Sequence, residues 1–315
     1  MSAAVSTDPQ GKAQATAQVA SQRGKRIGFA RHLKLYIDAV KPGIVMSNTL
    51  VTAAAYTFAT RHFDPVVFLA LILGTACIIG SACVVNNHFD REIDARMART
   101  AGRGQVTGFI SPFAATAYSY VLGIAGVTIL GTMTNSLTCV LGVIGWVTYA
   151  LVYTWSKHHT VHSTLIGTVP GAIPPVAGLT AGGLGRGWEA LALFLLLVAW
   201  QLVHFFAISI RRRDDYAAAG VPVAAVAYGV TPTKRLILAT AILNLAANVL
   251  MVFGAHISVW CSAVLLVFAV YWLVVCALGQ RAKTDAIAWA SRVFKISLLD
   301  IMLICAVLVI EPWLR

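Results

Sequence analysis

Charged residues are scarce in this sequence. They make up 11% of the 315 residues, whereas hydrophobic residues make up 58% and the mean hydropathy is +0.78. Water-soluble domains contain about 25% charged residues, which they need to cover an apolar core. The scarcity of charge therefore excludes a water-soluble globular protein and indicates an integral membrane protein.

Three other features are missing. The six cysteines (77, 83, 139, 261, 276 and 305) show no C-x-x-C spacing, so we interpret them as small buried apolar residues rather than as disulfides or zinc ligands. Residues 1–22 contain no apolar stretch and thus no cleavable signal peptide. The net charge of +12 forms no basic stripe interleaved with aromatics, which argues against nucleic acid as a partner.

We expect a disordered cytoplasmic tail over residues 1–30 and a transmembrane domain over 31–315.

Long uncharged stretches are what the sequence has instead. Each holds about 18–24 residues, enough to cross about 30 Å of hydrocarbon as a helix. The sequence thus predicts an all-α polytopic membrane protein, with nine transmembrane helices around a central cavity open near the cytoplasmic face. The predicted spans are 43–60, 65–88, 109–131, 135–155, 162–182, 188–210, 234–254, 257–279 and 294–311.

The basic residues are distributed unevenly between the two sides of such a bundle. With nine spans, 21 of the 24 lysines and arginines fall on the side that carries the N-terminus. Arg61, Arg186 and Arg315 are left for the other side. The positive-inside rule makes the first side cytoplasmic and places the C-terminus opposite. Two cytoplasmic loops are long and rich in acids and bases, so we expect the functional site on this face.

The first of these loops begins with a row of oxygen-bearing side chains. Asn86, Asp90 and Asp94 are four residues apart and share one face of a helix. Two carboxylates and an amide oxygen suit Mg²⁺, which commonly completes its shell with phosphate oxygens. The arginines that follow, Arg99 and Arg103 among them, match phosphate geometry. The alternative is a solvated loop helix with no ligand, but the position directly after an apolar span favours a metal–diphosphate site.

A second acid–base cluster follows the sixth span at the same membrane depth. Two such clusters on one face suit a shared diphosphate, although a stop-transfer arginine run with compensating acids would look similar. His204 lies inside the span, and ionisable residues within a membrane are functional candidates. The candidate residues here are Trp200, Gln201, His204, Arg211, Asp215 and Tyr216.

Three more ionisable residues are notable. Lys157, between the fourth and fifth spans, and Lys41, before the first, are candidates for binding a diphosphate. An interfacial lysine also simply anchors a helix, which is the alternative for Lys41. Asp300 lies midway through the last span, and pairing with a neighbouring helix is one interpretation of it.

At these residues the sequence resembles the UbiA-type superfamily of intramembrane prenyltransferases, and more closely its protohaem IX farnesyltransferase branch. The likeness covers about residues 35–312. The pattern N-x-x-x-D-x-x-x-D-x-x-M-x-R-T-x-x-R is matched by Asn86, Asp90, Asp94, Met97, Arg99, Thr100 and Arg103, with Gly104 in place of the usual proline. The second signature is matched by Trp200, Gln201, His204, Phe205, Asp215, Tyr216, Ala219, Gly220 and Pro222, with Val203 in place of a proline. Between them, the branch's G-x-x-x-G-A-x-P-P-x-x-G stretch is matched by Gly167, Gly171, Ala172, Pro174, Pro175 and Gly178. Lys157-His158 stands where Lys-Arg is usual.

The resemblance implies the reaction. Farnesyl diphosphate, haem B and water would give haem O and diphosphate, with Mg²⁺ as cofactor, in a bacterial inner membrane. The implied catalytic residues are Asn86, Asp90, Asp94, Asp215 and His204, of which the first three hold the metal. The implied substrate-binding residues are Lys41, Arg99, Arg103, Lys157, Arg211, Tyr216, Trp200 and Gln201. A terminal oxidase assembly or a haem A synthase is the implied partner.

Two other functions are compatible with parts of this pattern. A sister prenyltransferase would act on an aromatic acceptor such as 4-hydroxybenzoate, and the Trp-Gln-x-x-His and Asp-Tyr signatures argue against it. A secondary transporter would show internal repeats and a site at the midplane, whereas the charges here gather on one face.

Overall fold

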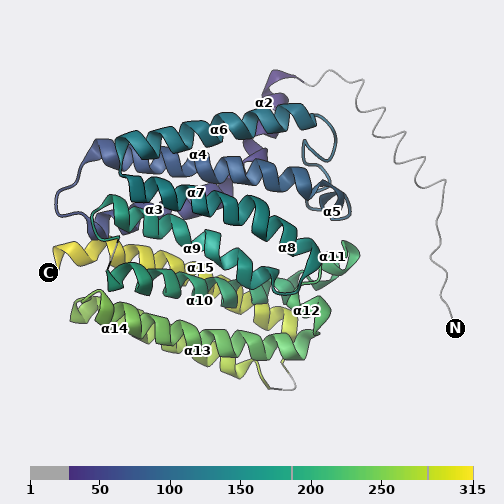
Figure 1. Cartoon of the computed structure of the whole chain (residues 1–315). Helices are drawn as coiled ribbons and strands as arrows, with labels where there is room; N and C mark the ends of the chain where they lie inside the picture. The colour runs from purple at the N-terminus through teal and green to yellow at the C-terminus, as the bar shows by residue number, and fades with distance from the viewer. Residues whose placement is uncertain (1–27, 186, 282–283, 315) are drawn as a thin grey trace.

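The computed structural model describes residues 28–185, 187–281 and 284–314, and this part of the chain is helical with no strand. Long helices run side by side along one common direction (Figure 1), as expected for an all-α membrane protein. They are α3 (Pro42–Ala59), α4 (Pro65–Phe89), α6 (Pro112–Met133), α7 (Ser136–Val147), α9 (Ser163–Ala181), α10 (Trp188–Arg211), α13 (Val230–Gly254), α14 (Val259–Leu278) and α15 (Ala286–Ile310).

Polar caps set where several of these helices begin. The Asp64 carboxylate accepts hydrogen bonds from the backbone of Val66 and Val67 at the start of α4, and Asp285 does the same for the first turn of α15. Such caps satisfy N–H groups that have no partner within the helix. Hydropathy predicted that the last helix begins at residue 294. The cap at Asp285 explains why it begins at Ala286 instead.

The predicted number of nine spans is not confirmed. Eight helices of the described part are long and apolar enough to cross a membrane, and α3 is not among them. Its 18 residues include a polar run, and the side chains of Ser47, Asn48 and Thr49 hydrogen-bond to carbonyls three or four residues back within the helix. Helix α3 nevertheless packs against α4, α9 and α15 within the bundle.

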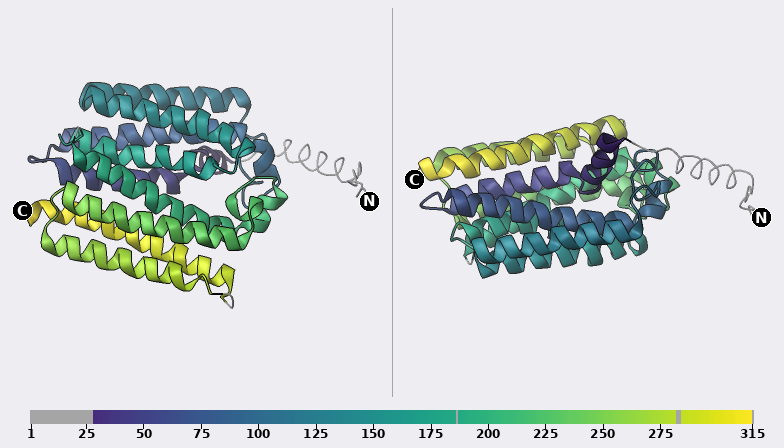
Figure 2. Two further views of the ribbon diagram at one scale, coloured as in Figure 1. Left: turned by 60° about the horizontal axis from the view of Figure 1, so that its bottom comes forward. Right: turned by 90° about the horizontal axis from the view of Figure 1, so that it is seen from above.

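Short helices gather at one end of the bundle (Figure 1), where the sequence predicted loops and, over residues 86–94, one helical face. They are α2 (Phe29–Ala39), α5 (Arg91–Ala95), α8 (Thr154–His159), α11 (Arg213–Ala218) and α12 (Ala224–Ala227). Helix α2 begins before the boundary predicted at residue 31, and most of the predicted tail, residues 1–27, lies outside the described residues. The C-terminal end of α15 lies at the opposite end of the bundle (Figure 2).

The predicted span 135–155 consists of three consecutive segments. Helix α7 continues as a π-helix, η1 (Thr148–Tyr153), and then as α8. The single span recognised by hydropathy runs over 136–159. A π-helix has one more residue per hydrogen-bonded loop than an α-helix. The residues after it, which are those of α8, are therefore turned about the helix axis relative to an uninterrupted α-helix.

Glycines on α9 bring the helices of the centre close together. A Cβ on Gly178 would lie 2.3 Å from the backbone oxygen of Thr52, and one on Gly171 would lie 2.0 Å from the side-chain oxygen of Gln201. Helix α9 therefore packs directly on the backbone of α3 and against a polar side chain of α10. This packing fixes α3, and with it the residue that precedes α3, Lys41.

Candidate active site

The first motif forms one buried row of oxygen atoms. Helix α4 ends at Phe89 and α5 begins at Arg91, but the backbone keeps its helical hydrogen bonds across the junction, from Asp90 to Asn86 (2.9 Å) and from Asp94 to Asp90 (2.8 Å). The three side chains therefore share a face, as their spacing predicted. Each of these residues is about 1% exposed. Buried carboxylates require cationic or hydrogen-bonding partners.

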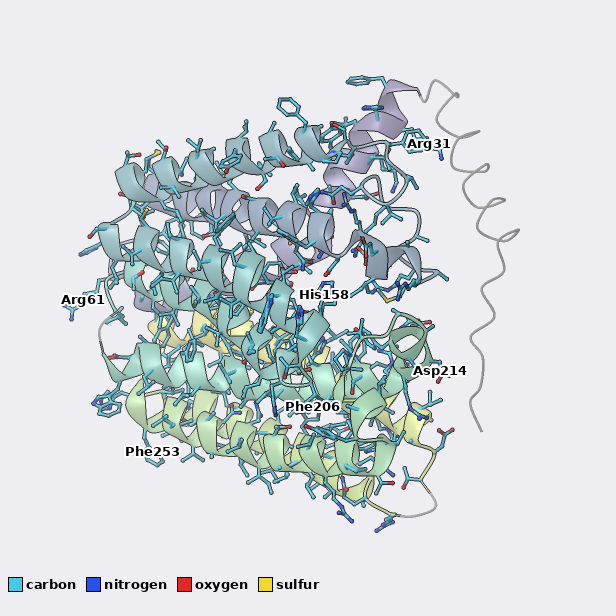
Figure 3. All side chains as sticks on the ribbon, turned by 45° about the vertical axis from the view of Figure 1, so that its right-hand side comes forward. Arg31, Arg61, His158, Phe206, Asp214 and Phe253 are labelled. Carbon is cyan, nitrogen blue, oxygen red and sulfur yellow. The ribbon has the colours of Figure 1, made fainter. Side chains whose placement is uncertain are left out.

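Helix α8 provides partners for Asp90. The Lys157 Nζ donates to one carboxylate oxygen of Asp90 at 2.7 Å, and the His158 Nε2 lies 3.1 Å from the other. The His158 side chain is partly exposed, and Figure 3 shows Arg61 at the other end of the bundle. The sequence analysis selected Lys157 as a site residue but not His158. The position of His158 directly after Lys157 could have indicated it.

The π-helical segment positions α8 for these contacts. The backbone N–H of Thr154 donates to the carbonyl of Tyr149, five residues back. The Thr154 hydroxyl then accepts a hydrogen bond from the Asn86 amide at 2.9 Å. The segment also stacks the rings of Tyr149 and Tyr153, with centroids 5.3 Å apart. A polar end of the fourth span is thereby joined to the first motif.

Asp94 has a different partner. Arg103 bridges the Asp94 carboxylate and the side-chain oxygen of Asn87, which it reaches at 3.1 Å. Asn87 donates in turn to the carbonyl of Ala39 at the end of α2 (2.8 Å). The structure thus places Arg103 beside the acidic row, as predicted, and adds Asn87 as a link that the sequence motif did not reveal.

Lys41 completes the row at its other end. Its Nζ donates to the side-chain oxygen of Asn86, and the ammonium lies 5.9 Å from the ring centroid of Tyr149. The backbone of Lys41 is left-handed, with φ of 53°. This conformation costs a non-glycine residue energy, and such residues are concentrated at functional sites. Here it turns the chain between α2 and α3 so that the lysine faces the motif.

The electrostatics of the row follow from these contacts. Burial works to raise the pKa of Asp90, but the charges of Lys157 and Lys41 and the hydrogen bonds from Lys157 and His158 outweigh it and hold the pKa below its ordinary value. Burial lowers the pKa of Lys41 to about 8, with the Asp90 charge opposing and the Arg103 charge adding to the shift. Three basic side chains and two carboxylates thus form one mutually dependent network.

The second loop approaches the first through apolar contacts. Ile93 and Met97 pack with Ala219, Val221 and Val223 in one buried cluster, and Tyr216 packs against its edge. The two loops therefore face each other, as predicted.

The charged residues of the second loop do not reach the acidic row. Asp215 pairs with Arg212 at 3.4 Å on the surface, and Arg211 lies over the ring of Phe294, 4.2 Å from its centroid. No hydrogen bond or ion pair joins Asp215 or Arg211 to the first motif within the described residues.

The remaining candidates of α10 form a separate group. The His204 Nδ1 lies 2.7 Å from the hydroxyl of Ser297, its ring stacks on Trp200, and the Trp200 indole donates to the Ser297 carbonyl (2.9 Å). Gln201 donates to the carbonyls of Thr168 and Leu197. These contacts hold α10 against α15 and α9. Ser297 is the partner that the sequence analysis missed.

Two hollows lie beside the acidic row. One of about 320 Å³ lies between α2 and the first loop, and its lining includes Asn87, Arg99 and Arg103. The other, of about 500 Å³, is lined in part by Arg91, Arg96 and His158. Arg99 is exposed and makes no ion pair in the described structure. Each hollow thus shares with the acidic row a residue that contacts one of its carboxylates, Arg103 in the first and His158 in the second.

Asp300 does not find the partner that we considered for it. It is about 1% exposed, and its Oδ2 has no hydrogen-bond partner. The other buried side-chain atoms of the described residues in this condition belong to Asn244, Asn248 and Trp272. All four lie on α13, α14 or α15. The six cysteines are free, and four of them are buried as predicted, whereas Cys77 and Cys139 are partly buried.

Comparisons with known proteins agree with the sequence motifs. The model of the UbiA prenyltransferase family matches residues 48–299. The protoheme IX farnesyltransferase 2 of Pseudomonas entomophila (strain L48) is 35% identical over 271 residues, which cover 85% of this chain and 92% of that protein. The protoheme IX farnesyltransferase of Pseudomonas syringae pv. tomato is 38% identical with the same coverage.

Solved structures share the fold. A digeranylgeranylglyceryl phosphate synthase in membranes superposes with a TM-score of 0.76 at 16% identity, over 90% of this chain and 100% of that chain. A UbiA homolog from Archaeoglobus fulgidus bound to GPP and Mg²⁺ gives a TM-score of 0.61 at 14% identity, over 87% of this chain and 99% of that chain.

Proposed function

The chain belongs to the UbiA prenyltransferase family, and we propose that it transfers the farnesyl group of farnesyl diphosphate to a vinyl group of haem B, with addition of water, to give haem O. Relatives named protoheme IX farnesyltransferase at 35–38% identity support the choice of substrates. The observation that carries the chemistry is the burial of Asp90 and Asp94 within a ring of basic side chains.

A divalent cation fits this arrangement. Asn86, Asp90 and Asp94 present a row of oxygen ligands, and Mg²⁺ is commonly held by one or two carboxylates, waters and substrate phosphates. Among the described residues no three His, Cys, Asp or Glu side chains converge into a complete metal cage, which is compatible with an ion that shares its shell with a diphosphate. The bound ion would supply positive charge that makes diphosphate a better leaving group.

The basic residues would change partners when the diphosphate binds. Lys41, Lys157 and Arg103 each contact a ligand residue of the row in the structure. An ion on the carboxylates would release these side chains to phosphate oxygens, where Lys provides a point charge and Arg a planar fork. Arg99 is already free to do so. The cations would thus stabilise the charge that develops on the leaving diphosphate.

Loss of diphosphate leaves an allylic cation, which the electron-rich vinyl group attacks before water captures the resulting cation. The surrounding helices would exclude bulk water, so that the allylic cation is not hydrolysed first. His204, held by Ser297 and Trp200, is our candidate for orienting the porphyrin. Asp215, Arg211, Tyr216 and Gln201 remain proposed site residues, with Asp215 and Arg211 acting after a closer approach of the second loop.

Membrane placement follows the charge distribution. We propose that the end of the bundle with α2, α5 and α11 faces the cytoplasm of a bacterial cell, at the inner membrane, because the sequence assigns 21 of the 24 lysines and arginines to this side. The product would pass to a haem A synthase or to an assembling terminal oxidase.

The experiment that tests the function is mass analysis of haems extracted from cells with and without the gene. A farnesyl-hydroxyethyl haem that appears only with the gene is the expected result. A prenylated aromatic acid instead would assign the protein to the sister branch, and unchanged haems and prenylated products would favour a transporter. In a purified assay, EDTA should abolish transfer and added Mg²⁺ should restore it, while activity that survives EDTA would contradict the metal site.

A further inference from the structure

Helix α2 differs from every long helix in its direction. It lies across the end of the bundle rather than along it, as the views in Figures 1 and 2 agree. Three large apolar residues, four positions apart, are exposed along it: Phe29 (83%), Leu33 (50%) and Ile37 (48%). At that spacing they form one stripe on one face of the helix.

The other face of α2 is fixed to the protein. Leu35 and Tyr36 pack against the buried cluster of Ala39, Val84, Ile110 and Ala115. Tyr36 also meets the ring of Tyr118 edge-on, with centroids 5.4 Å apart. The helix is therefore held in place from one side, and its exposed stripe is a defined surface rather than the side of a frayed end.

The polar side of α2 carries positive charge. Arg31 projects at this end of the molecule (Figure 3) and has no ion-pair partner among the described residues. Lys34 is exposed and pairs with Asp38 at 2.7 Å, so that the acid of the helix is neutralised. An apolar stripe on one side of a helix and uncompensated basic charge on its polar side are the pattern of a helix that lies in a membrane interface containing anionic lipids.

We propose that α2 is an interfacial helix that docks on the anionic lipid leaflet at this end of the bundle. Phe29, Leu33 and Ile37 enter the boundary between headgroups and acyl chains, and Arg31 contacts lipid phosphates. The orientation of α2, across the spanning helices, lies in the plane of that leaflet.

The docking has a consequence for the active site, and this part rests on the proposed function. Helix α2 ends at Ala39, whose carbonyl receives the hydrogen bond of Asn87. Two residues later Lys41 contacts Asn86. A helix anchored in the leaflet thus holds the connection that places Lys41, and loss of the anchor should loosen it.

The docking itself is tested without an activity assay. The full chain, with the photoreactive residue benzoylphenylalanine at Leu33, is reconstituted in nanodiscs of phosphatidylcholine and phosphatidylglycerol and irradiated. Phospholipid adducts are expected by mass spectrometry, with far fewer from the same probe at Lys34. Adducts to a peptide of this chain, equal adducts at both positions, or no lipid adducts would overturn the proposal.

The link to the site is tested by activity. Farnesyl transfer by the wild type should be faster when phosphatidylglycerol is present than in phosphatidylcholine alone. Leu33→Gln should lose this stimulation, whereas Phe253→Gln, which also replaces an exposed apolar side chain by glutamine but on α13, should keep it. Equal stimulation of both variants would overturn the link. If no transfer occurs in any lipid, the proposed function fails, and the crosslinking result still decides whether α2 docks.

Discussion

Lys157 and Asp90 are 67 positions apart in the chain, yet their side chains form an ion pair at 2.7 Å. Asp90 lies just after α4 and is almost fully buried, and Lys157 lies on α8. His158 contacts the second oxygen of the same carboxylate. The pair joins the ends of two helices into one charged site. Substitutions of its two residues should therefore distinguish binding of farnesyl diphosphate from the transfer step.

Asp90→Asn should lower farnesyl transfer by about 100-fold or more, because it removes one carboxylate of the proposed metal site and leaves Lys157 without its counter-charge. Haem O formation by the purified variant measures the effect. Extraction of membranes with carbonate checks that the variant is still inserted. Wild-type turnover in an inserted variant would exclude a metal role for Asp90.

Lys157→Met should reduce kcat/KM for farnesyl diphosphate by about ten- to a hundredfold, which corresponds to the loss of one hydrogen bond to a charged group. Lys157→Arg keeps the charge and should recover part of the loss. Steady-state kinetics at varied farnesyl diphosphate provide the measurement. The assignment fails if methionine and arginine have equal effects.

Gly178→Ala should destabilise the protein by about 1–3 kcal/mol, because the new Cβ cannot fit against the backbone of α3 without displacing it. Thermal unfolding in detergent measures the change. The matched control is Gly131→Ala, whose Cβ would lie 3.5 Å from the sulfur of Cys139, an ordinary contact. Equal melting temperatures for the two variants would contradict the close packing of α9 on α3.

Asp300→Leu should stabilise the protein by about 1–3 kcal/mol, the cost of a buried polar group without a partner. Asp300→Asn keeps a polar group of the same shape and should gain less. Unfolding in the same detergent gives both values. A drop in stability, or loss of farnesyl transfer, would instead assign Asp300 a partner or a role in the reaction.

The acidic row illustrates how far the sequence reaches. The four-residue spacing of Asn86, Asp90 and Asp94 determines a shared face wherever the backbone stays helical, and it does so across the junction of α4 and α5. The structure places Lys41, Arg103 and Lys157 in contact with this motif, and their predicted role in binding a diphosphate stays a prediction. Asp215 and Arg211 show the limit, because acid–base runs on one face of the membrane need not touch, and these two pair locally instead.

The hydropathy of the chain by itself determined a helical membrane protein, since apolar stretches of that length have few other stable forms in lipid. The same pattern determined which end of the bundle carries the charges. The tertiary structure alone decided that α2 lies across the bundle, that α3 packs within it against α4, α9 and α15, and that η1 rotates α8. These features depend on contacts between segments far apart in the chain, such as Lys157 with Asp90, and no local pattern specifies them. The aspartate-rich loop could therefore be identified from sequence, whereas the ring of basic side chains that buries it is a product of the fold.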